Sequence, residues 1–158
     1  MNISKILNSH LYEFKVNKSQ NGGLFVFNQT LDYILKKSDK GSLHAIFSDS
    51  SFEYEVHIQD DSVDQRFLTV SIIAGSNGLE KNDDLTGFGK PIPVLSTTIK
   101  ILLEHFKIHG TRPVRLLAID EPRCQLYYNI SRKILSDWYI CVAGNNVILL
   151  PLSYFENV

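Results

Sequence analysis

Cysteine, methionine and tryptophan are scarce in this chain. Its 158 residues include two cysteines, one methionine and one tryptophan. Cys124 and Cys141 are too few for a disulfide scaffold and have no CxxC spacing. The opening residues, MNISKILNSHLYEF, contain one lysine and no sustained apolar core, so they do not resemble a secretory signal. We therefore expect a protein of the reducing cytoplasm.

Long apolar runs and complete catalytic motifs are also missing. No apolar run approaches the roughly 20 residues that a membrane-spanning helix needs, so we expect no membrane span. The HExxH order is absent, and Asp60, Asp61 and Asp64 lack the spacing of a calcium-binding loop, which predicts a solvated acidic turn. We therefore expect no metal site. A length of 158 residues suits a single core, and no linker divides it.

The net charge of −1 conceals an uneven distribution. Residues 44–86 carry two basic and nine acidic side chains, whereas residues 87–158 carry eight basic and five acidic ones. Such an asymmetry could steer an anionic ligand towards the C-terminal half. Solvated strand edges and loops produce the same distribution, and we favour that interpretation because charge asymmetry alone is not specific.

The segment Leu85–Leu135 is the most strongly patterned part of the chain and begins with a predicted helix. We expect this helix to start at Pro91 or Pro93 and to end at Gly110. The hydroxyls of residues 96–98 are candidates to accept from the unpaired N–H groups of its first turn. Its buried face is predicted from apolar residues at three- and four-residue spacing, namely Leu95, Ile99, Leu102, Leu103 and Phe106.

A strand and a second helix follow in the same segment. Val114 to Ile119 is a short apolar run, typical of a strand buried on both faces. Asp120 is a candidate N-cap, and Pro122 suits the first turn of the helix that follows. Helix, buried strand and helix in succession indicate a crossover connection onto a shared sheet.

The remaining segments favour strands. Residues 43–47, 52–58 and 67–73 have strand patterns and short polar links, which predicts an antiparallel meander with one wet face. Residues 138–142 and 147–152 flank Gly-Asn-Asn and predict a closing hairpin, with its last strand as an exposed edge open to dimerisation. Nearer the N-terminus we expect helices over residues 2–12 and 29–37 and a strand over residues 24–27.

These elements predict an α+β fold in a single domain spanning residues 1–158. Residues 1–42 form a variable N-terminal part, and residues 43–158 form the core. The core is expected to hold a mostly antiparallel sheet with a strand–helix–strand–helix unit and a C-terminal hairpin.

This order of elements resembles the GNAT acyltransferase superfamily. The resemblance implies that the turn Gly87-Phe88-Gly89, with Lys90, holds the pyrophosphate of acetyl-coenzyme A, since helix N-termini attract phosphate. It also implies that Tyr127, in a Leu-Tyr pair, acts as general acid. Asp84 stands where the superfamily usually has arginine or glutamine, and prolines 91 and 93 remove N–H donors nearby, which indicates an altered cofactor site.

A closer resemblance is to a family of short, uncharacterised proteins from phages, other mobile elements and bacterial genomes. The matching residues are LTGFG at 85–89, VLSTTI at 94–99 and EPRCQLY at 121–127, and the likeness covers roughly residues 43–142. The family has no established activity. It implies a role connected with phages, mobile elements or the defence against them.

Three functions follow as hypotheses. We expect a non-catalytic accessory protein that has a degenerate GNAT-like fold, binds another protein and needs no cofactor. The alternative is an acetyl-coenzyme A-dependent N-acyltransferase in which Tyr127 protonates the leaving thiolate and Arg123 binds a phosphate or carboxylate. For Arg123, an ion pair with Asp120 or Glu121, or plain solvation, is the simpler interpretation. The third is nucleic-acid binding through Lys100, Lys107, Arg112, Arg115, Arg132 and Lys133, which a pI near 6.5 disfavours.

Two further side-chain groups have functional and structural interpretations. His105 and His109 share a helix face and could grip a metal, but no third ligand is evident, and His109 next to Gly110 also suits a helix C-terminus. Cys124 near a helix N-terminus would have a lowered pKa if exposed. A buried, structural cysteine is the preferred interpretation.

Overall fold

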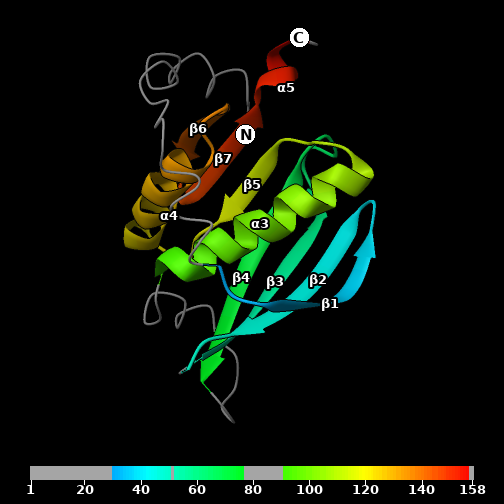
Figure 1. Cartoon of the computed structure of the whole chain (residues 1–158). Coiled ribbons are helices and arrows are strands. Elements are labelled where there is room, and N and C mark those ends of the chain that lie inside the picture. The colour runs from blue at the N-terminus through cyan, green and yellow to red at the C-terminus, as the bar shows by residue number, and fades with distance from the viewer. Residues whose placement is uncertain (1–29, 51, 77–90, 157–158) are drawn as a thin grey trace.

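The computed structural model describes residues 30–50, 52–76 and 91–156, and these residues form a seven-stranded sheet with three helices (Figure 1). The sheet order is β1-β2-β3-β4-β5-β7-β6. The strands are β1 (Tyr33–Asp39), β2 (Ser42–Ser48), β3 (Phe52–Asp60), β4 (Leu68–Ser76), β5 (Val114–Leu117), β6 (Trp138–Ala143) and β7 (Asn146–Pro151). The helices are α3 (Pro91–His109), α4 (Glu121–Ile134) and α5 (Leu152–Glu156). The predicted α+β class with a mostly antiparallel sheet is confirmed.

The predicted meander is present in β2, β3 and β4, which pair antiparallel in sequence order. Alternation sets its two faces, because successive side chains of a strand point to opposite sides. Ala45 and Val56 enter the core, whereas His44, Glu55 and His57 lie on the other face. The predicted wet face and core face therefore both exist.

The first strand corrects the helix predicted over residues 29–37. Residues Tyr33–Asp39 form β1, which pairs antiparallel with β2. Leu31 and Tyr33 pack against the core, but Ile34 and Leu35 remain 63% and 48% exposed. The helical spacing of Leu31, Ile34 and Leu35 therefore gave a wrong prediction. Pairing with β2 satisfies the backbone hydrogen bonds of this segment and makes it a strand. The helix predicted over residues 2–12 and the strand over 24–27 lie outside the described residues.

Helix α3 is the main cover of the sheet. It starts at Pro91 and is followed by Gly110, whose φ of 96° and N–H···O bond to Phe106 end the helix as predicted. The hydroxyls expected to cap its first turn do something else. Those of Thr97 and Thr98, whose side chains are buried, donate to carbonyls one turn earlier, at 2.7 and 2.9 Å.

Helix α4 begins as predicted. Asp120 is its N-cap, accepting from the backbone N–H of Arg123 at 2.9 Å, and Pro122 lies in the first turn. The strand before it is shorter than predicted and is not buried on both faces. β5 ends at Leu117, which is partly exposed, as is Ile119 beyond it.

β6 and β7 pair antiparallel, and the turn between them contains Gly144 at a φ of 63°. The expected exposed edge at residues 147–152 is wrong, because β7 lies between β5 and β6 and ends at Pro151. The short helix α5 then follows, which the sequence patterns did not predict.

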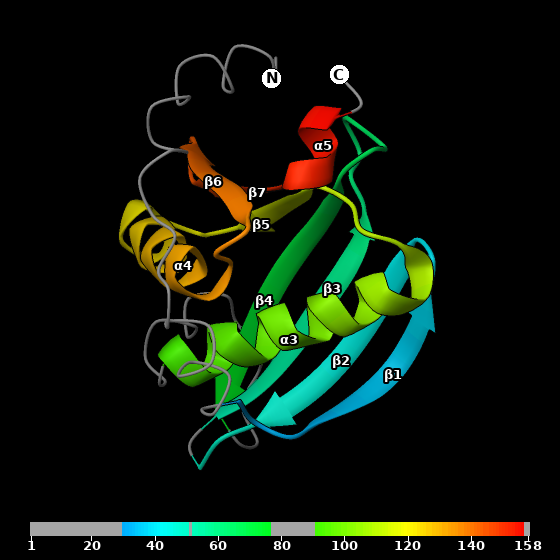
Figure 2. The ribbon, with the colours of Figure 1, turned by 45° about the horizontal axis from the view of Figure 1, so that its top comes forward.

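The helices cover the two faces of the sheet unequally (Figure 2). α3 crosses β2, β3 and β4, and α4 lies beside it, so both contribute to one continuous core on the same face. α5 packs on the opposite face of β7, in a second, smaller cluster formed by Phe67, Cys141, Ala143, Ile148 and Leu150. None of the helices in the described ranges has the length and apolarity needed to cross a bilayer.

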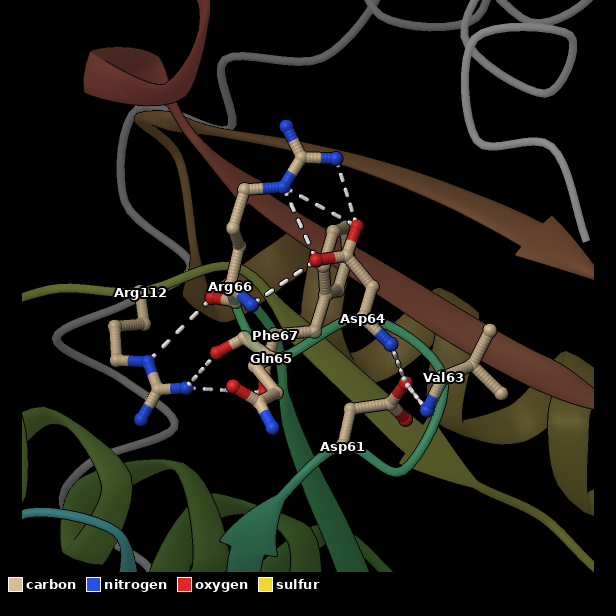
Figure 3. Close-up of polar contacts among 7 residues, drawn as sticks. All are labelled: Asp61, Val63, Asp64, Gln65, Arg66, Phe67 and Arg112. Carbon is tan, nitrogen blue, oxygen red and sulfur yellow. Dashed lines mark hydrogen bonds and ion pairs between the residues drawn. The ribbon is translucent and has the colours of Figure 1, made fainter.

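A network of hydrogen bonds fixes the loop between β3 and β4 (Figure 3). Asp61 is only 5% exposed and accepts from the backbone N–H groups of Val63 and Asp64 and from the Thr69 hydroxyl. Arg112 reaches across from the α3–β5 connection to the carbonyls of residues 65, 66 and 67. The solvated acidic turn predicted here is therefore wrong for Asp61, which is an internal anchor of the loop.

Candidate functional site

The one parallel pairing in the described sheet, between β4 and β5, extends over only a few residues. Leu68, Thr69 and Val70 pair with Val114, Arg115 and Leu116 in turn. Beyond Val70 the two strands diverge, while β5 continues its antiparallel pairing with β7. The edge of β4 is therefore not paired with β5 from Ser71 onwards.

A cleft of about 230 Å³ lies where the strands separate. Its walls come from β4, the end of β5, the β5–α4 connection, α4 and the start of β7; the lining residues are Ser71, Ile72, Leu117, Ala118, Ile119, Tyr127 and Asn146. The N–H of Ala118 donates to the carbonyl of Asn145 at 3.2 Å, which holds the connection against the hairpin turn. A backbone hydrogen bond, and not side-chain packing alone, therefore holds this wall of the cleft in position.

Tyr127 reaches the cleft from the second turn of α4 and is otherwise buried. A second tyrosine, Tyr54 on β3, lies near it. The Tyr54 hydroxyl donates to Asp49 at 2.9 Å. Burial, followed by this hydrogen bond and the Asp49 charge, raises the pKa of Tyr54 far above its ordinary value. Tyr54 is therefore a fixed hydrogen-bond donor to Asp49, and Tyr127 is the tyrosine that lines the cleft.

The structure brings Tyr127 to the cleft but not its neighbours on α4. Arg123 forms an ion pair with Asp120, the helix cap, and does not line the cleft. Cys124 is buried, and burial, together with the Glu121 carboxylate, raises the pKa of its thiol. The ion-pair interpretation of Arg123 and the structural interpretation of Cys124 both agree with these surroundings.

The predicted phosphate-binding turn, Gly87, Phe88, Gly89 and Lys90, lies outside the described residues. The helix that follows it is described from Pro91 onwards. Pro91 and Pro93 both fall in the first turn of α3, where they remove two of the four N–H groups that such a helix end would otherwise present.

His105 and His109 do share a face of α3, with ring centroids 4.7 Å apart. His105 is buried, and the burial of its ring, followed by the nearby His109, lowers the pKa of His105. In the described residues, the group with metal-ligand geometry lies elsewhere, at His44, Glu55 and His57. The alternation of β3 predicts that Glu55 and His57 share a face. It does not predict the register with β2, which places His44 opposite His57.

The lowered pKa of His105 predicts a stability change with pH. An unfolded histidine takes up a proton near pH 6.5, whereas the folded His105 resists it, so stability should be complete above that pH and should fall as the pH drops below it. Urea denaturation from pH 8 to pH 5 should show this decrease, and His105→Leu should reduce its slope. An unchanged slope in the variant would contradict the assignment to His105.

Comparison with known proteins finds no matching family model, no matching curated protein and no matching solved structure. The class of this protein therefore comes from its architecture. In the described residues it is an α+β protein with a mixed sheet, and the cleft lies where the parallel strands β4 and β5 separate.

Proposed function

We propose that the chain is an acyltransferase that binds an acyl-coenzyme A thioester in the cleft between β4 and β5 and transfers the acyl group to an amine. The observation that carries this proposal is the cleft itself, which opens at the diverging strands and has Tyr127 in its wall. The GNAT resemblance of the sequence implies that a working enzyme has an open cleft between splayed strands. A protein that had lost the activity could fill the same gap with side chains.

The edge of β4 suits an extended ligand that contains amide groups. The ladder to β5 stops at Val70, so the backbone of Ser71 and Ile72 borders the cleft without β5 as a partner. An extended chain with alternating amide donors and acceptors can pair with such an edge as an added strand does. The pantetheine arm of coenzyme A has two amides and a narrow cross-section, which is the shape that this edge can bind.

Tyr127 supplies the proton in the proposed reaction. The amine nitrogen attacks the thioester carbonyl carbon, the new C–N bond forms, and the C–S bond breaks with its electron pair leaving on sulfur. The Tyr127 hydroxyl gives its proton to the departing thiolate, as the resemblance implies. The amine proton passes to solvent, and the phenolate recovers a proton from water.

The two prolines at the start of α3 limit how the nucleotide part can be held. With N–H groups missing at Pro91 and Pro93, the helix end is a poor anchor for a pyrophosphate. We therefore expect the thioester and pantetheine, rather than the nucleotide, to provide most of the binding free energy.

Isothermal titration with acetyl-coenzyme A tests the proposal. We expect one-to-one binding, and we expect acetyl-pantetheine, which lacks the nucleotide, to bind within about tenfold, a difference of about 1.4 kcal/mol. Ala118→Leu should abolish binding by filling the cleft, while Ile108→Leu on exposed α3 surface should not. Absence of heat at millimolar acetyl-coenzyme A would overturn the proposal.

A specific feature of β1 supports the protein-binding alternative. Within the described residues β1 is an edge strand, and it exposes Ile34 and Leu35 beside unpaired backbone groups. Such an edge can accept a strand from another protein. A cytoplasmic role with a protein partner, in a setting of phages or mobile elements, therefore remains our second proposal.

Three of the six basic residues considered for nucleic-acid binding have internal partners: Arg112 and Arg115 form ion pairs, and Arg132 lies over the Tyr128 ring.

A further inference from the structure

Two histidines and one glutamate meet on the face of the sheet opposite α3 and α4. His44 on β2 lies directly across from His57 on β3, and Glu55 precedes His57 by two residues, so all three side chains share that face. Their neighbours in sequence, Ala45 and Val56, point into the core and hold the two strands in place. The three side chains therefore extend from rigid, paired backbone.

The donor atoms are close enough to surround one ion. Nε2 of His44 lies 3.1 Å from Oε1 of Glu55, and Nε2 of His57 lies 4.0 Å from Oε2 of the same carboxylate. One ligand atom from each residue falls within 4.8 Å of the others. In a tetrahedral zinc site the ligand atoms are about 3.3 Å apart, since each bond is about 2.0–2.1 Å. Small side-chain rotations close that difference.

The charges of the cluster also favour a cation. The two imidazole rings stack with centroids 4.3 Å apart and an interplanar angle of 14°. Two protonated rings at that distance repel each other, whereas two neutral rings present lone pairs to a metal and the Glu55 carboxylate offsets part of its charge. Lys37 on β1 is paired with His44 on β2, but the Lys37 ammonium group lies 3.7 Å from the Asp39 carboxylate, which offsets its positive charge.

We propose that His44, Glu55 and His57 form a binding site for a divalent first-row transition ion of the Zn²⁺ type. Two imidazoles and a carboxylate are a ligand set that suits zinc and leaves a fourth position for water or an external ligand. Water can reach this position, because the side chains are 28%, 19% and 38% exposed in sequence order. The site is independent of acyl transfer, although His57 lies across from Ser71, which lines the cleft.

Titration of the untagged, EDTA-treated full chain with ZnCl₂ tests this site. We expect one-to-one binding that weakens about 100-fold or more in Glu55→Gln and in His57→Asn, because loss of a direct ligand costs at least as much as loss of its supporting groups. His109→Asn is the matched control, since it removes a histidine outside the cluster and should leave the affinity unchanged. Circular dichroism of each variant checks folding.

Co²⁺ gives a second readout on the wild-type chain alone. Visible absorption bands of tetrahedral Co²⁺ should appear on addition of one equivalent and disappear on addition of Zn²⁺. Absence of zinc binding to the wild type, or binding that the Glu55 and His57 substitutions leave unchanged, would overturn the proposal. Either result would leave the acyltransferase proposal unaffected, since that proposal is tested by acetyl-coenzyme A.

Discussion

Replacement of Tyr127 by phenylalanine should lower the rate of acyl transfer about 100-fold or more, the usual contribution of a general acid. The phenyl ring keeps the packing of α4 and the wall of the cleft, so the affinity for acetyl-coenzyme A should change little. Only the proton for the leaving thiolate is lost. The release of coenzyme A thiol can be followed with a thiol reagent, using acetyl-coenzyme A and a panel of polyamines, aminoglycosides and peptides as acceptors. The two cysteines of the chain are buried and should add little background.

Tyr128→Phe is the matched control for this experiment. Tyr128 is the next residue on α4 and is also buried, but it does not line the cleft. Its replacement should leave the rate nearly unchanged. Equal losses in the two variants would show that the effect comes from the packing of α4, and an unaffected rate in Tyr127→Phe would remove this residue from the chemistry.

Replacement of Asp61 by alanine should lower the free energy of unfolding by about 3–5 kcal/mol, the usual cost of breaking a buried ion pair. Burial raises the pKa of Asp61, but hydrogen bonds from Thr69, Asp64 and Val63, together with the Arg115 charge, outweigh that effect and keep the pKa below its ordinary value. The substitution leaves those donors without their acceptor and leaves Arg115, 3.1 Å away, without its counter-charge.

Urea denaturation followed by fluorescence of the single tryptophan, Trp138, measures this loss. Asp60→Ala is the control, because Asp60 is adjacent but more than half exposed, so solvent reaches its ion pair with Arg112. Its replacement should cost about 1 kcal/mol or less. A similar small cost for Asp61→Ala would mean that solvent, rather than the carboxylate, satisfies the loop.

The meander and the two long helices could be predicted because their burial follows simple periods. β3 alternates between core and open face from Glu53 to Ile58, and α4 has both an N-cap at Asp120 and a proline in its first turn. β1 could not be predicted in this way. Leu31, Ile34 and Leu35 have helical spacing, yet the unpaired edge of β2 determines that this segment is a strand.

The candidate site could be predicted only in part. Tyr127 was identified from the Leu-Tyr pair, and it does line the cleft. Ser71, Ala118 and Asn146 were missed, because the point at which β4 and β5 separate depends on register and not on residue type. The same reason hid the cluster of His44, Glu55 and His57, whose members come together only through strand pairing.

The brevity of the β4–β5 pairing has a mechanical consequence. The sheet consists of two blocks, β1–β4 and β5–β7, and their shared ladder spans only Leu68 to Val70 on the β4 side. A small rotation of one block about that segment would change the width of the cleft without breaking a backbone hydrogen bond. The contact between α3 and α4 and the ion pair between Arg115 on β5 and Asp61 both restrain such a rotation, so the size of molecule that the cleft admits depends on these contacts.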